Sequence, residues 1–167
     1  MKLVGKYISR ALVWSVMLWL TACATPPPVA PATAVARFVI EAGAEQSAVG
    51  VVLPVSGVAL RVRPKPVITE FDIVGVVEAQ VEMGRCLAFR LTGGAARDLY
   101  RLTGTSIGSR LVLLVDGRPL GARVIDRPIE GGVIFIFAEV PEASLARLVT
   151  DLNNTVALLQ EQAAKAR

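Results

Sequence analysis

The stretch from Leu91 to Val140 constrains the fold of this chain more than any other. A Gly93-Gly94 break follows an apolar run there, and it predicts the start of a helix over residues 95–107. Small or apolar side chains recur at helical spacing on one face of that helix, namely Ala95, Leu99, Leu102 and Ser106. Gly108 follows, and glycine most readily adopts the left-handed conformation that ends a helix. The first half of the stretch therefore predicts one amphipathic helix.

The second half of the stretch predicts strands joined by turns. The apolar run Leu111–Val115 leads to Asp116-Gly117, which is the strongest short-range hairpin signal in the chain. A second turn over Pro128–Gly132 precedes Val133–Phe137, a β-branched and aromatic strand. The predicted order is helix, strand, tight turn, strand, turn, strand. None of these residues is an obvious chemical reagent.

The flanking segments predict further strands and a second helix. Strand patterns occur at residues 38–40, 51–53 and 59–63, and the pattern over 71–81 fits either a strand or a helix. After Pro141 an apolar stripe at helical spacing predicts a helix, which Asn153-Asn154 could end or bend. We therefore expect an α+β fold, an antiparallel sheet with two main helices packed on one face. The expected core residues are Leu99, Leu102, Leu113, Val115, Ile134, Ile136, Leu145 and Leu148.

The first residues have the charge and hydropathy pattern of a signal sequence. Lys2, Lys6 and Arg10 precede an apolar run of about ten residues, too short to span a bilayer as a helix. The run ends in Leu20-Thr21-Ala22-Cys23, which resembles the lipobox of bacterial lipoproteins. The resemblance implies a signal peptide over 1–22 and lipid, including palmitate, on Cys23. Ala24 follows in place of the aspartate that resembles an inner-membrane retention signal, so the outer membrane is favoured over the inner. The alternative is an ordinary signal peptide with a chance cysteine.

Composition and charge then divide the rest of the chain. Residues 23–36 contain four prolines among small residues, which predicts an extended tether of up to about 40 Å at about 3.1 Å per residue. We expect the folded domain over 37–155 and a helix extension or frayed tail over 156–167. The formal net charge of +4 comes mostly from the first ten residues, which leaves no clustered basic footprint for nucleic acid.

Residues that could carry catalysis are few. The chain has no histidine, so Ser-His-Asp and Cys-His arrangements are excluded, and neither a metal site nor a cofactor is predicted. Cys86 lies on a strand face with Ala88 and Arg90; it is either a reactive thiol or, as we favour, a strand cysteine without a chemical task. The carboxylates that could pair for acid–base chemistry are Asp72, Asp98, Asp116, Asp126 and Glu130. Arg118, Arg123 and Arg127 fit either contact with acidic lipid headgroups or a partner, or a solvated charged edge, which we favour.

Several short motifs follow one another in a fixed order over residues 91–146. They are Leu91-Thr92, Gly94-Ala95, Leu102-Thr103, Gly108-Ser109-Arg110-Leu111, Asp116-Gly117, Pro128-Ile129-Glu130-Gly131-Gly132 and Glu142-Ala143-Ser144-Leu145-Ala146. In this order they resemble the head of the first periplasmic domain of SecD and SecDF, membrane components of the bacterial protein-export machinery. Pro66-Val67-Ile68-Thr69 and Asp72-Ile73 resemble the segment before that head. The sequence shows no transmembrane helix after its signal. The resemblance therefore implies the head fold and a capacity to contact polypeptides, and it does not imply proton-driven export.

Three functions remain open from the sequence. The favoured one is a lipid-anchored, non-catalytic module of the cell envelope, facing the periplasm, that binds polypeptide or an envelope protein without a small-molecule substrate. It would bind at a sheet edge, either beside Asp116-Gly117 or near Val58–Val62. The second is a structural or assembly lipoprotein that acts as a scaffold. The third, an enzyme, is the least favoured.

Overall fold

The computed structural model describes residues 33–166. The elements are β1 Ala36–Ile40, β2 Val49–Val52, β3 Ala59–Val62, the 3-10 turn η1 Glu70–Asp72, β4 Ile73–Val81, β5 Gly84–Leu91, α2 Gly93–Gly104, β6 Arg110–Val115, β7 Arg118–Val124, β8 Val133–Ile136 and α3 Glu142–Lys165. All strand pairs are antiparallel. The predicted α+β class is confirmed.

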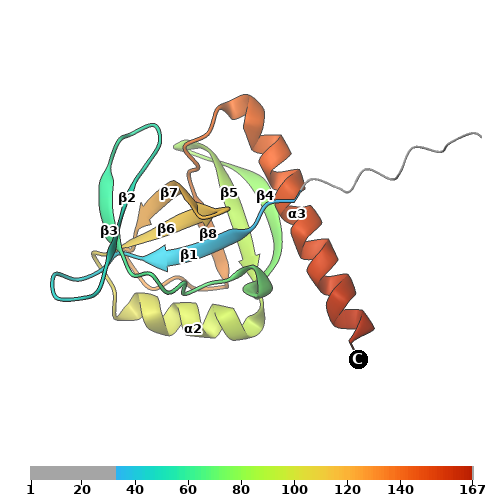
Figure 1. Cartoon of the computed structure of the whole chain (residues 1–167), viewed down its shortest axis with the longest axis horizontal. Coiled ribbons are helices and arrows are strands. Elements are labelled where there is room, and N and C mark those ends of the chain that lie inside the picture. The colour runs from blue at the N-terminus through green and yellow to red at the C-terminus, as the bar shows by residue number, and fades with distance from the viewer. Residues whose placement is uncertain (1–32, 167) are drawn as a thin grey trace, which may run out of the picture. The chain divides into compact units, whose positions relative to one another are not determined.

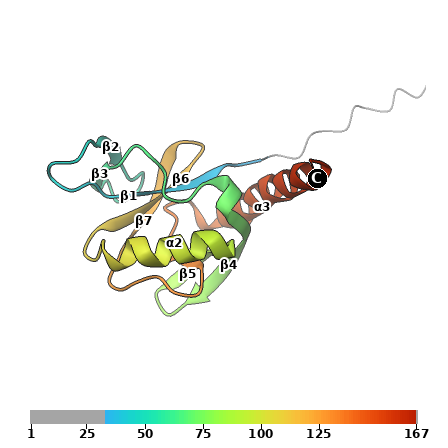
Figure 2. The ribbon, with the colours of Figure 1, turned by 90° about the horizontal axis from the view of Figure 1, so that it is seen from below.

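The strands are divided among three sheets, where the sequence pattern suggested one. Their orders are β1-β6-β7, β4-β5-β8 and the two-stranded β2-β3. The two larger sheets approach each other at Gly121, where an added Cβ would overlap the carbonyl oxygen of Phe137. The Glu139 amide also donates to the Leu120 carbonyl oxygen at 2.6 Å. Figures 1 and 2 show α3 on the opposite side of the strands from the β2–β3 hairpin.

Local sequence rules explain most of the boundaries. Asp116 and Gly117 have φ of 50° and 78°, and they join β6 to β7 as the two-residue hairpin that the Asp-Gly pair predicts. The Thr92 hydroxyl caps α2 by accepting from the Ala95 amide at 3.3 Å. Helix α2 covers 93–104, so the expected span of 95–107 was wrong at both ends. A turn over 105–109 takes the last residues, with Gly108 at a φ of 86°.

The buried face of α2 is rotated from the predicted one. Ala95, Leu99 and Thr103 are buried, whereas Leu102 is only partly buried. Thr103 fits the core because its hydroxyl donates to the Leu99 carbonyl oxygen at 2.7 Å and accepts from the Ile129 amide at 2.9 Å. A polar residue in the core was not predicted, since apolar spacing alone favoured Leu102.

Helix α3 is continuous through Asn153-Asn154. The Asn153 side chain is used between elements: its Oδ1 accepts from the Val76 amide at 3.0 Å, and its Nδ2 donates to the Val76 carbonyl oxygen at 2.7 Å. These bonds attach α3 to β4, next to the register shift between Ile73 and Gly75. The chain before β1 also meets α3, where the Ala34 amide donates to the Asp151 carbonyl oxygen at 3.2 Å.

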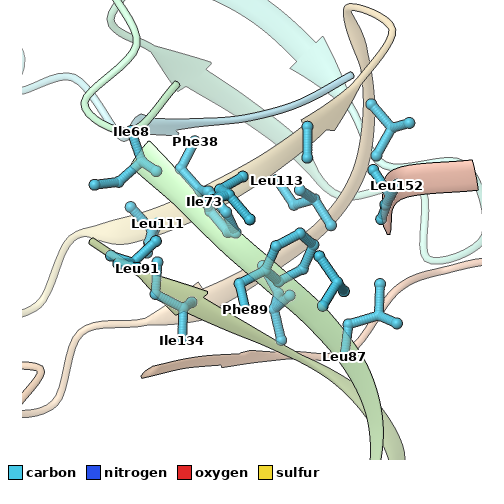
Figure 3. Packing of buried hydrophobic residues seen from close by; sticks show 14 of the residues in the cluster. Phe38, Ile68, Ile73, Leu87, Phe89, Leu91, Leu111, Leu113, Ile134 and Leu152 are labelled. Carbon is cyan, nitrogen blue, oxygen red and sulfur yellow. The ribbon is translucent and has the colours of Figure 1, made fainter. Parts of the chain in front are cut away.

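One large hydrophobic cluster fills the space between the sheets and both helices. Phe38 and Phe89 meet edge to face with ring centroids 5.0 Å apart, and Figure 3 shows Leu111, Leu113 and Ile134 converging on the same cluster. Six of the eight expected core residues are buried, and Leu102 and Leu148 pack against the cluster while partly exposed. A smaller cluster of Val39, Leu53, Leu60, Val62 and Val112 lies under the β2–β3 hairpin. Every buried member of both clusters lies between residues 34 and 156, so the described part of the chain carries its own core.

Candidate functional site

The predicted lipidation residue, Cys23, lies outside the described residues, as do the predicted signal peptide and most of the predicted tether. The site that the structure does describe is the outer edge of the β2–β3 hairpin. We call it the hairpin edge and define it by strand β2, Val49–Val52, together with Val55 and Val58 at the connecting turn.

The hairpin edge is an unpaired strand edge among residues 33–166. Strand β2 pairs only with β3, in the register Val49↔Val62 to Val52↔Ala59. The other side of β3 is occupied. The Ala42 amide donates to the Arg61 carbonyl oxygen at 2.8 Å, and the Arg63 amide donates to the Ile40 carbonyl oxygen at 2.9 Å. The backbone groups on the far side of β2 are therefore available for a further strand.

This edge is apolar, and its surface valines are exposed. Val49, Val52 and Val55 are 52%, 58% and 75% exposed, and Val58 is also exposed. Residues 46–60 contain no charged side chain. Natural sheet edges usually carry lysine, proline or a bulge that blocks pairing with another chain. Strand β2 has none of these, so its edge can accept an extended segment.

The hairpin is held at both its base and its tip. Leu53, Leu60 and Val62 enter the smaller core cluster beneath it. At the tip, a carboxylate oxygen of Glu139 accepts from the amides of Val55 and Ser56 at 2.8 and 2.9 Å. Burial opposes ionisation of this carboxyl, but its hydrogen bonds with Ser56 and Val55 outweigh that effect, so the pKa of Glu139 lies below its ordinary value. The edge is therefore presented by an anchored element.

The two edges expected from the sequence behave differently. Beside Asp116-Gly117, β6 is central between β1 and β7, and the outer side of β7 meets residues 137–139. The Val58–Val62 region does belong to the exposed hairpin, but its open strand is β2 and not β3. Strand β2 was missed in part because the segment up to Gly50 resembles a connection. The run of valines without a charged neighbour was the sequence signal that could have identified this strand.

The candidate catalytic groups do not converge. A carboxylate oxygen of Asp72 accepts from the Thr69 hydroxyl at 2.8 Å, Asp98 lies 3.8 Å from Arg101, and Asp116 accepts from the Val35 amide at 2.9 Å. Cys86 is fully buried, and burial raises the pKa of its thiol. Within residues 33–166 no group of three or more potential metal ligands comes together. The observed roles of Asp72, Asp98 and Asp116 are local hydrogen bonds and an ion pair.

These observations define the class of the protein: an α+β domain with antiparallel sheets and an unprotected strand edge. Each helix over residues 33–166 is too short or too polar to span a bilayer. No protein-family profile and no curated protein matches the sequence.

Solved structures of SecDF do match the fold. The crystal structure of SecDF in its super-membrane-facing form matches with 20% identity and a TM-score of 0.53, over 74% of this chain and 18% of that chain. A second structure, of a membrane component SecDF that enhances protein export, matches with 17% identity and a TM-score of 0.55, over 93% of this chain and 72% of that chain. The predicted resemblance to SecD and SecDF domains is confirmed at the level of fold. The chain spans less than a fifth of the first of these proteins.

Proposed function

We propose that this chain is a SecD-like module of the cell envelope, related to protein export, that binds extended polypeptide at the hairpin edge without catalysis. The observation that carries the proposal is the unpaired, uncharged edge of β2 with its exposed valines. The fold similarity to SecDF, a membrane component that enhances protein export, supports the export context. An envelope protein that offers an extended strand could bind the same edge through the same backbone hydrogen bonds.

Strand addition explains how one site would take many sequences. The backbone of an incoming segment would continue the β2–β3 ladder through amide–carbonyl hydrogen bonds, which depend little on side chains. Val49 and Val52 would supply apolar contact, and an uncharged edge adds no electrostatic selection. Binding of this kind is weak and reversible, because an unfolded segment loses conformational entropy when it becomes ordered.

The lipid anchor is the second part of the proposal. Lipidation at Cys23 and a tether over 23–36 would hold the domain over 37–155 at a membrane surface facing the periplasm, with the outer membrane favoured over the inner. Tethering raises the local concentration of the hairpin edge near the membrane, which makes weak contacts useful. Replacement of Cys23 by Ser should abolish incorporation of labelled palmitate, because no other residue offers the acyl-accepting thiol there. Labelling that persists in Cys23→Ser would refute the anchor.

A scaffold or assembly function is the second candidate, and one observation favours it. Helix α3 runs unbroken from Glu142 to Lys165, and Leu158 near its end is exposed. A long helix with an exposed apolar residue can support self-association. Analytical ultracentrifugation of the protein from residue 23 onward, as the Cys23→Ser variant, separates the two functions. A stable oligomer that is lost in Leu158→Lys would favour the scaffold.

The polypeptide-binding proposal is tested by titrating the same Cys23→Ser protein with a reduced, unfolded secretory polypeptide while amide signals are followed by NMR. We expect shifts at Val49–Val52, and we expect them to disappear in Val52→Lys, which places a charge on the edge. Ile107→Lys is the matched control, since Ile107 is a β-branched residue of the same exposure, 58%, outside the hairpin. No shift at about millimolar polypeptide, or equal losses in both variants, would refute binding at this edge.

A further inference from the structure

The outer face of the β4-β5-β8 sheet is unexpectedly apolar. Val77, Ala88 and Phe135 lie directly opposite one another on adjacent strands, so their side chains share one face. Phe137 follows Phe135 by two residues, directly after the end of β8, and is also exposed. Ile134 and Ile136 on the same strand point the other way, into the core. We call this surface, with Val77, Ala88, Phe135 and Phe137, the open sheet face.

The large side chains of the open sheet face are exposed to solvent. Val77, Phe135 and Phe137 are 56%, 44% and 37% exposed, while the small Ala88 between them is buried. An antiparallel sheet with one face in the core usually turns a polar face to water. Exposed aromatic rings next to each other are instead typical of a contact surface.

Three arginines lie on or beside the open sheet face. Arg90 is on this face, two residues from Ala88, and its guanidinium lies next to Gly75 on β4, across β5 from the phenylalanines. The Arg123 Nη1 donates to the Phe135 carbonyl oxygen at 3.1 Å. A hollow of about 420 Å³ opens beside Phe135, and Arg123, Arg127, Glu130 and Val133 help to line it. The structure thus separates the three arginines of the sequence cluster: Arg123 and Arg127 share this hollow, while Arg118 lies at the other end of β7.

Two of the three arginines on this surface lie outside ion pairs. Among residues 33–166, neither Arg90 nor Arg127 forms an ion pair, and Arg123 has only Asp126 at 3.8 Å. Glu130 is the acidic residue that lines the hollow. Apolar rings bordered by guanidinium groups match the boundary of an anionic bilayer, where rings enter the acyl region and arginines meet phosphates.

We propose that the open sheet face docks on the surface of a bilayer that contains anionic phospholipids. Phe135 and Phe137 enter the interface, and Arg90, Arg123 and Arg127 contact lipid phosphates. A bilayer is favoured over a protein partner because the surface combines exposed aromatic rings with two cations, Arg90 and Arg127, that form no ion pair among residues 33–166. This inference does not depend on lipidation of Cys23, nor on polypeptide binding at the hairpin edge.

The test uses residues 23–167 as the Cys23→Ser variant, which contains no tryptophan because Trp14 and Trp19 precede this segment. Phe135→Trp then provides a single reporter. We expect its emission to shift to the blue with phosphatidylcholine vesicles that contain phosphatidylglycerol, and brominated acyl chains to quench it. Phe71→Trp is the matched control: Phe71 is 69% exposed and lies on η1, outside the strands of this sheet, so it should not respond.

Charge variants in the same background test the arginines. Arg127→Gln should weaken partitioning by about fivefold, since each cation near an anionic surface contributes a factor of that order. Arg118→Gln removes the same charge at the far end of β7 and should change partitioning far less. Sedimentation of the protein without the reporter, before and after Phe135→Ser, checks the result if the tryptophan variant misfolds. Equal response to neutral and anionic vesicles, equal effects of Arg118→Gln and Arg127→Gln, or no binding to either vesicle would overturn the proposal.

Discussion

At the residue scale, a buried hydroxyl joins two parts of the core. Thr103 is fully buried, and its hydroxyl bonds both the Leu99 carbonyl oxygen and the Ile129 amide. Substitution by an apolar side chain of the same shape leaves the Ile129 amide buried without a partner. A buried amide without a partner costs more free energy of folding than its hydrogen bond contributes when it is formed.

We therefore expect Thr103→Val to lower the free energy of unfolding by about 1–3 kcal/mol, the usual cost of an unsatisfied buried group. Thr103→Ser keeps the hydroxyl and should cost less. Chemical denaturation of both variants measures the difference. A loss in Thr103→Val within about 0.5 kcal/mol, the range of surface changes, would show that the two hydrogen bonds contribute little.

A second residue-scale prediction concerns acid. The lowered pKa of Glu139 means that the ionised carboxylate stabilises the native state. That contribution is fully present above the pKa of the unfolded chain, about 4.3 for glutamate. It is lost as the pH falls through the lower native value. The β2–β3 hairpin should thus loosen from its tip in acid.

Glu139→Gln should flatten the dependence of the unfolding free energy on pH below about 4.3. It should also weaken protection of the Val55 and Ser56 amides in hydrogen exchange at neutral pH. Glu82→Gln removes an exposed carboxylate at the β4–β5 turn and serves as the control. An unchanged acid slope in Glu139→Gln would contradict the role that we assign to this carboxylate.

At the element scale, α3 and β4 are joined by a side-chain amide. Asn153 completes both hydrogen bonds of the Val76 backbone on the side of β4 that faces away from β5. Asn153→Leu should cost about 1–3 kcal/mol, because it leaves both Val76 groups without their partner. Exchange of the Val76 amide should also become faster. Gln160→Leu, at an exposed position of the same helix, should change neither; an equal effect of both would argue against the link.

At the scale of the whole molecule, the two larger sheets depend on a close backbone approach. Gly121 meets the Phe137 carbonyl oxygen with no room for a side chain. Gly121→Ala should force β7 away from residues 137–139 and lower stability by at least about 1–3 kcal/mol, the range for overpacking. Gly50→Ala adds the same methyl on β2, where nothing lies within 4 Å, and it should be tolerated. Thermal unfolding compares the two, and similar losses would show that the approach at Gly121 is not restrictive.

The sequence by itself determined those features that depend on local rules. The Asp116-Gly117 hairpin and the strand over 133–136 follow from turn chemistry and side-chain type, which act over a few residues. The Gly93-Gly94 break likewise located the start of α2 to within two residues. The ordered motifs between Leu91 and Ala146 also indicated the SecD-like fold, which the solved structures confirm.

The tertiary structure decided what depends on residues far apart in the chain. Periodicity placed Leu102 in the core, but a hydrogen bond from the distant Ile129 allows Thr103 to be buried there instead. The division into three sheets and the open edge of β2 depend on which strands meet, and hydrophobic alternation is the same for a paired and an unpaired strand. The grouping of the three arginines was also decided by the tertiary structure. Arg118 and Arg123 lie at opposite ends of the extended strand β7, and only Arg123 meets Phe135 on β8.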